Sequence, residues 1–233
     1  MESRRRPPGR PPASGDPLTA ERILDAALEA FATHGYEGVS VRELNKELGI
    51  SHSAIYQRFG SKDGLWRAAV DHGFGRITRH MADVFDPTLT DPLEQLRLWI
   101  SRLMRFSAQH PQILALMNIE GRQDTERLAY IYDTYIGSAM GRVKALLEHL
   151  EASGRIRPVP LRTFHFLVSH GGAAPYTLAA LAEHFDPRSP LDPDEVEAHA
   201  NLVADLIISA LVSSATPPAL SGQSRGRDSH GDR

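Results

Sequence analysis

The densest group of chemically useful side chains in this sequence lies between residues 49 and 65, in the stretch GISHSAIYQRFGSKDGL. Its spacing predicts a short helix between two turns, with Ile55 and Phe59 on the inner face. The outer face would carry hydroxyl, amide and cationic groups from His52, Ser53, Tyr56, Gln57 and Arg58. Such a helix suits the DNA major groove, where cations and hydroxyls contact phosphates and short polar groups contact base edges.

Other kinds of chemistry find little support in the residue pattern. The chain has no cysteine, which excludes disulfides and thiolate metal sites. It also has no Ser/His/Asp motif, glycine-rich phosphate loop or metal-ligand spacing. His165 and His170 stand five residues apart, which would place them on different faces of an α-helix. We therefore expect no enzymatic activity, no cofactor and no metal site.

The charge pattern is compatible with a nucleic-acid partner. The net charge is −3, but residues 1–70 hold 10 Lys and Arg against 9 Asp and Glu, whereas the remainder holds 16 against 20. Charge acts locally, and the basic side chains gather near the N-terminus and on the 49–65 stretch. No apolar run reaches the roughly 18 residues of a membrane span, and no apolar stretch follows the N-terminal arginines. We expect a cytoplasmic protein with no membrane partner.

Helical periodicity runs through most of the chain and predicts an all-α fold. Residues 1–17 should form a flexible basic arm, and residues 214–233 a disordered tail. Between them we expect a three-helix helix-turn-helix domain over residues 18–72 and a larger helical bundle over residues 73–213. A linking helix running to about Phe85 would join the two.

Glycines and potential cap residues suggest where the helices begin and end. The first helix should run from about Thr19 to His34 and end at Gly35. Ser40 with Glu43 forms a capping box for the second helix. Ser51 and Ser61 would cap the third and fourth helices.

The fourth helix contains two glycines, Gly73 and Gly75, each costing about 1 kcal/mol relative to alanine. Either a softened link between the two domains or close packing against another helix explains them.

In the larger region, Asp91 and Asp192 each precede a proline and mark helix starts. We expect helices near 93–109, 112–121 and 125–152. Another should span 161–185 and bend around residues 171–175, because Pro175 cannot continue the backbone ladder.

The last helix is apolar on most of its circumference, with only Asp205 and Ser209 polar between residues 202 and 212. Such a helix must be covered on nearly all sides. We interpret it as part of a dimer interface, the alternative being a central core helix of a monomer. The candidate interface residues are Leu161, Val168, Val196, His199, Val203, Leu206, Ile207 and Ala210.

The stretch from Thr19 to about Asp71 resembles the DNA-binding domain of TetR-type transcriptional regulators. The residues that carry the resemblance are Gly49, Ile50, Ser51, Ile55-Tyr56, Phe59, Ser61-Lys62-Asp63 and Leu65, together with the upstream Phe31, Gly35-Tyr36 and Val39-Ser40-Val41-Arg42. Asn45 and Leu48 depart from it, because the family usually has Ala there. The remaining three quarters of the chain is similar only in being all-helical.

The resemblance implies roles for individual residues in binding double-stranded DNA. His52, Ser53 and Ala54 would face base edges. Tyr56 would contact a phosphate, Gln57 could bind adenine, and Arg58 could reach a phosphate or guanine. The remaining contacts would come from Ser40, Arg42 and Lys62, with Arg4, Arg5 and Arg6 in the adjacent minor groove.

The resemblance also implies a homodimeric regulator, usually a repressor, that a small molecule releases from a near-palindromic operator. The effector itself is unknown. Candidate ligand-binding residues in the larger domain are Trp99, Leu103, Phe106, Met117, Tyr135, Phe166 and His170, although a plain core role is open for each. A transcriptional activator, a ligand-independent regulator, a helical-bundle enzyme and a lipid-binding module are the alternatives.

Overall fold

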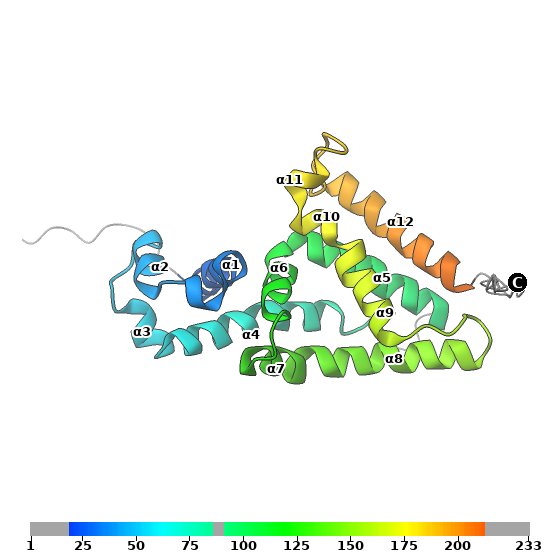
Figure 1. The fold of residues 1–233 in the computed structure, drawn as a ribbon, viewed down its shortest axis with the longest axis horizontal. Coiled ribbons are helices and arrows are strands. Elements are labelled where there is room, and N and C mark those ends of the chain that lie inside the picture. Colours follow the sequence, from blue (N-terminus) through cyan, green and yellow to red (C-terminus); the bar gives the residue numbers. More distant parts are fainter. Residues whose placement is uncertain (1–18, 86–90, 213–233) are drawn as a thin grey trace, which may run out of the picture.

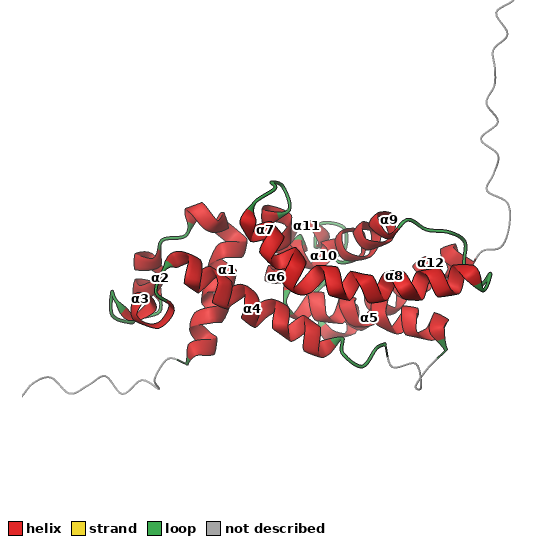
Figure 2. Cartoon of the chain, turned by 90° about the horizontal axis from the view of Figure 1, so that it is seen from below, coloured by secondary structure: helices red, strands yellow, loops and turns green. Residues whose placement is uncertain are grey.

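The computed structural model describes residues 19–85 and 91–212, and every regular element in these ranges is a helix (Figures 1 and 2). The all-α prediction is confirmed. The expected basic arm, with Arg4, Arg5 and Arg6, and the expected tail lie outside the described residues. The N-terminal elements are α1 (Ala20–Gly38), α2 (Val41–Glu47), α3 (Ala54–Phe59) and α4 (Lys62–His80). They are followed by α5 (Pro92–Gln109), α6 (Pro111–Glu120), α7 (Glu126–Ile131), η1 (Tyr132–Ile136), α8 (Gly137–Ala152), α9 (Leu161–Phe166), η2 (Leu167–Gly172), α10 (Ala174–Thr177), α11 (Ala179–Ala182) and α12 (Pro193–Val212), where η marks a π-helical turn.

Helices α1, α2 and α3 form a small unit at one end of the molecule, here called the head (Figure 1). The Ser40 hydroxyl accepts a hydrogen bond from the Glu43 backbone N–H at 3.3 Å, and the Ser61 hydroxyl accepts one from the Gly64 N–H at 2.9 Å. Both predicted caps are therefore confirmed. Gly35 has a φ of 68° and interrupts the helical backbone of α1 where the sequence predicted its end.

The predicted cap at Ser51 is wrong. α3 begins at Ala54, and its N-cap residue Ser53 makes no side-chain capping bond. Instead, the Ser51 carbonyl accepts a hydrogen bond from the Ala54 N–H at 3.0 Å. This turn moves the N-cap from Ser51 to Ser53, so the helix starts two residues later than predicted.

α4 runs out of the head and lies against α1. It ends at His80, five residues before the predicted Phe85, and residues 81–85 form turns. Met81 and Val84 in these turns are buried in the core of the larger domain. These turns are therefore packed against the core of the larger domain.

Two hydrophobic cores hold the chain together. The first joins the head to the larger domain, because Phe31 and Trp66 pack in the same cluster as Ile113 and Leu116 of α6. The second is built mainly from α5, α8 and α12. α4 contributes to the first core along its length and meets the second at Ile77. It therefore contributes to both cores, as does α5, whose Phe106 lies in the first core.

The predicted helix over 125–152 is a continuous path made of α7, η1 and α8, with a π-helical turn inside it. The predicted helix over 161–185 is divided into α9, η2, α10 and α11, and Pro175 stands in the first turn of α10. The break around residues 171–175 is confirmed. The two π-helical turns have no counterpart in the sequence prediction.

Candidate nucleic-acid interface and internal cavity

α3 has one buried and one bare face. Ile55 has no exposed surface, whereas Tyr56 is 50% exposed and Gln57 and Arg58 are exposed. His52 and Ser53 are exposed in the turn that leads into the helix, and Ala54 is half-buried. The apolar face and the polar face thus lie as the sequence predicted, and the polar one is open to a partner.

The other predicted contact residues lie around the same end of the molecule. Arg42 is exposed at the start of α2, and among the described residues neither Arg42 nor Arg58 forms an ion pair. Lys62 is engaged, because its Nζ donates to the Glu37 carbonyl at 3.3 Å and lies 4.7 Å from the centre of the Tyr36 ring. A DNA contact by Lys62 would have to compete with these interactions.

The turn between α2 and α3 is tied by Asn45, which is fully buried. Its Nδ2 donates to the His52 carbonyl at 3.1 Å, and its own carbonyl accepts from the Ile50 N–H at 3.0 Å. An alanine could make only the second bond. This departure from the family pattern therefore serves to fix the turn, although Asn45 Oδ1 has no hydrogen-bond partner in the structure.

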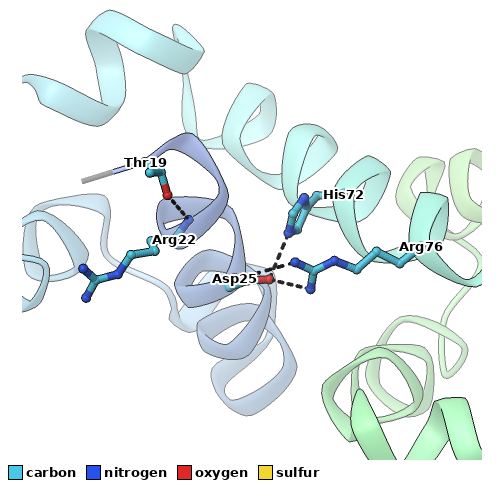
Figure 3. Close-up of polar contacts among 5 residues, drawn as sticks. All are labelled: Thr19, Arg22, Asp25, His72 and Arg76. Atoms are coloured by element: carbon cyan, nitrogen blue, oxygen red, sulfur yellow. Dashed lines mark hydrogen bonds and ion pairs between the residues drawn. The ribbon is translucent and has the colours of Figure 1, made fainter. Parts of the chain in front are cut away.

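α4 is connected to the head by an ionic cluster (Figure 3). A buried contact joins the same two parts. The Asp25 carboxylate on α1 accepts hydrogen bonds from His72 Nε2 at 2.9 Å and Arg76 Nη1 at 2.8 Å. Burial raises the pKa of Asp25, but the hydrogen bonds from His72 and Arg76 outweigh it and leave the pKa below its usual value. A Cβ on Gly73 would lie 2.8 Å from Leu28 Cδ2, so close helix packing explains this glycine.

On its other side, α4 is connected to the larger domain through Asp71. The Asp71 carboxylate accepts hydrogen bonds from the Tyr130 hydroxyl at 2.7 Å and the Tyr135 hydroxyl at 2.6 Å. Burial and the bond to Asp71 raise the pKa of Tyr135, so its hydroxyl stays protonated and continues to donate. α4 is thus held from both sides by hydrogen-bonded carboxylates.

A cavity of about 390 Å³ lies in the larger domain, enclosed by α4, α5, α6, η1, α8, α9 and η2. Six of the seven candidate ligand residues line it: Trp99, Leu103, Phe106, Met117, Tyr135 and His170. Phe166 does not. It is 53% exposed, and its ring stands beside that of His170, 4.9 Å between centres.

The sequence analysis missed several polar lining residues. Among them are Thr78, Arg79, Ser107, His110, Thr134, Ser138, Arg142, His165 and Ser169. Gly75 also lines the cavity, and a Cβ there would lie 3.3 Å from a guanidinium nitrogen of Arg79. Long polar side chains at a cavity rim have no periodic signal in the sequence, so spacing could not distinguish them from solvated surface residues.

The expectation that His165 and His170 lie on different faces is wrong. η2 winds about five residues into one turn, so both side chains reach the cavity, with ring centres 6.0 Å apart. Ser169 Oγ donates to the His165 carbonyl at 2.6 Å and lies 2.9 Å from His170 Nδ1. Burial lowers the pKa of both rings, and for His165 the neighbouring His170 adds to the effect. Within residues 19–85 and 91–212 no group of three or more potential metal ligands lies together.

The outer surface of α12 matches only part of the predicted interface. Leu206 is 61% exposed and Ala210 is exposed, but Ile207 is buried against the protein's own core, and so is Val168 of η2. Ile207 faces inward because α12 packs on α5, and Val168 faces inward because η2 also packs on α5. The Nε2 of His199 lies 2.7 Å from the Gly172 carbonyl oxygen.

Of the other candidates, Leu161, Val196 and Val203 are half-buried. Exposed apolar residues that the prediction left out of the interface are Phe166, Leu167 and Leu202.

Two family models match the chain in the regions just described. Residues 23–69 match the model for "Bacterial regulatory proteins, tetR family", and residues 92–207 match "Tetracyclin repressor-like, C-terminal domain". The chain belongs to the TetR family of bacterial regulatory proteins. The resemblance carried by the residues around α2 and α3 is thereby confirmed.

Characterised relatives within the TetR family are similar over part of their length. The transcriptional repressor AcnR of Corynebacterium glutamicum is 36% identical over 104 residues, which cover 40% of this chain and 55% of AcnR. The repressor SCO4008 of Streptomyces coelicolor is 30% identical over 112 residues, covering 48% of this chain and 54% of that protein. The chain thus spans about half the length of these relatives.

Solved structures show the same fold over most of the chain. FadR of Bacillus subtilis, crystallised with stearoyl-CoA, superposes with a TM-score of 0.58 at 21% identity and covers 81% of this chain and 97% of its own. AibR, crystallised with isovaleryl coenzyme A and operator DNA, gives a TM-score of 0.57 at 19% identity, with 82% and 96% covered. At these identities the likeness concerns the fold.

Among the described residues, no helix is both long and apolar enough to cross a membrane.

Proposed function

We propose that this chain is a homodimeric transcriptional repressor that binds a near-palindromic operator and leaves it when a small molecule occupies the cavity. The observation that carries the proposal is the bare polar face of α3, set on a buried apolar face. Relatives named as transcriptional repressors support it. The proposal places the protein in the cytoplasm, where its operator would be, and assigns it no catalytic step.

Dimerisation would occur through α12 and the neighbouring η2. Three leucine side chains are more than half exposed there: Leu202 and Leu206 on α12 and Leu167 on η2. Exposing this apolar surface to water is unfavourable, and a second copy of the chain would cover it. A dimer would present two α3 helices to successive major grooves, about 34–36 Å apart or modestly more.

Release from DNA would be transmitted by α4. Tyr135 lines the cavity and holds Asp71 of α4, while His72 and Arg76 of α4 hold Asp25 in the head. A ligand that displaces Tyr135 or the cavity-facing side of α4 would therefore shift the head. It can do so only to the extent that it binds the DNA-free arrangement more tightly.

The proposal is tested by selecting bound sites from a random duplex pool with the purified full chain and measuring affinity against salt concentration. We expect a near-palindrome bound at least about 10³-fold more tightly than random DNA. Tyr56→Phe should weaken binding to every sequence by removing a phosphate contact, whereas Gln57→Ala should relax preference at one base pair.

Tyr132→Phe supplies the matched control. Tyr132 is 54% exposed, close to the 50% of Tyr56, but lies on η1 away from the head. It should leave DNA affinity unchanged. Recovery of no common motif, with binding that vanishes at physiological salt, would refute the proposal, since only nonspecific charge contacts behave in this way.

A further inference from the structure

The cavity has an unusual charge balance. Its lining residues include Arg79 and Arg142 but no Asp or Glu. The nearby carboxylates are already engaged, Asp25 with His72 and Arg76 and Asp71 with two tyrosine hydroxyls. Among the described residues, the two arginines of the lining therefore have no carboxylate that neutralises their charge.

The two cavity arginines differ from most others in the larger domain. Between Lys62 and Val212 most described arginines are paired with a carboxylate, for example Arg97 with Asp205 and Arg105 with Glu197. Within the described residues no ion pair involves Arg79 or Arg142. Arg142 instead lies over the ring of Phe85, 4.9 Å from its centre.

The rest of the lining is apolar and aromatic. Trp99, Phe106, Met117 and Leu103 supply the walls, and Arg79 and Arg142 are both exposed, which places them at the rim. His165, Ser169 and His170 add hydrogen-bonding groups deeper in the wall. A volume of about 390 Å³ lies near the small end of ligand pockets, which run to roughly 1,000 Å³.

We infer that the ligand of this cavity is a small apolar carboxylic acid, whose carboxylate is bound by Arg79 and Arg142 and whose hydrocarbon or aromatic body fills the interior. The inference rests on the proposed function and names the class of its effector. Guanidinium groups bind carboxylates by charge-assisted hydrogen bonds, and the apolar walls exclude a second charge.

The test is calorimetric titration of the full chain with matched probes that differ in charge alone. Decanoate is compared with decanamide and decylamine, and 1-naphthylacetate with its amide. Each acid should bind at about one per chain and about tenfold more tightly than its amide, with decylamine weakest. These comparisons use the unaltered protein, so they do not depend on any variant folding.

Substitutions then test whether the two arginines bind the carboxylate. Arg79→Gln and Arg142→Gln should each weaken acid binding by about tenfold and leave amide binding unchanged. Arg122→Gln is the control, because Arg122 is exposed and does not line the cavity. Thermal unfolding without ligand checks that each variant is folded.

Equal affinity for acid and amide, tighter binding of the amine, or failure of both acids to bind would overturn the inference. Because the titration uses no DNA, it is separate from operator binding. Acids that bind in this way but do not release the selected operator would leave the ligand class standing and refute the release step of the proposed function.

Discussion

Replacing Gly73 by alanine would put a methyl group into the tightest contact between α1 and α4. The new Cβ would lie 2.8 Å from Leu28 Cδ2 and 3.5 Å from Ile113 Cγ1, and Leu28 has no exposed surface. Overpacking a core by about one methyl group typically costs about 1–3 kcal/mol. Alanine in a helix gains about 1 kcal/mol over glycine. We therefore expect the free energy of unfolding to fall by roughly 1 kcal/mol.

Gly141→Ala in α8 measures the helix-propensity contribution without the overpacking contribution. No atom lies within 4 Å of its Cβ position, so this variant should gain up to about 1 kcal/mol. Urea unfolding followed by far-ultraviolet circular dichroism, at one protein concentration, measures both. If Gly73→Ala were stabilised as much as Gly141→Ala at an unchanged m-value, the Leu28 side chain would have to move aside at little cost in free energy. The close packing of α1 on α4 would then not be what requires glycine.

Three further predictions concern α4, the turn before α3 and the cavity. Tyr135→Phe removes one bond to Asp71. Under the proposed function, the protein should keep its affinity for the selected DNA site but need more ligand for release, which fluorescence anisotropy would show. Unchanged release would exclude this link. Asn45→Asp places a buried carboxylate against the His52 carbonyl. Urea unfolding should show a loss of about 3 kcal/mol, against about 1 for Asn45→Ala. The pKa values of His165 and His170 are lowered from 6.5. As the pH falls, the unfolded chain therefore binds protons at these two histidines at a higher pH than the folded chain does. The free energy of unfolding should fall as the pH drops below about 6.5. A His165→Gln, His170→Gln double variant that loses as much stability between pH 7.5 and 5.5 as the unaltered protein does would contradict this.

Local chemistry is what made part of the structure predictable from the sequence. Ser40 and Ser61 cap helices because a hydroxyl at that position lies within reach of the backbone N–H three residues further on. The aromatic candidates Trp99 and Phe106 line the cavity because helical spacing places them on the inner side of α5. In both cases the deciding interaction lies within a few residues or on one helix face.

Other features depended on contacts that sequence spacing does not reveal. The start of α3 was predicted too early because the preceding turn is tied by Asn45 to a carbonyl seven residues away. The inward orientation of Ile207 and Val168 depends on which side of α12 and η2 meets α5, and an almost wholly apolar helix carries little information about that choice. Arg79 and Arg142 were missed because sequence spacing does not show that neither forms an ion pair within residues 19–85 and 91–212.

The two π-helical turns make the cavity sensitive to chain length as well as to side-chain identity. η1 and η2 each place residues on the cavity wall, and both interrupt otherwise α-helical paths. An α-helix turns by about 100° per residue, so deleting one residue from η2 would restore the regular winding and rotate α9 by about that angle. His165 would leave the wall while α4 and the head kept their sequence. Single-residue insertions and deletions are thus a route by which such a regulator could acquire a new effector without altering the DNA site that it recognises.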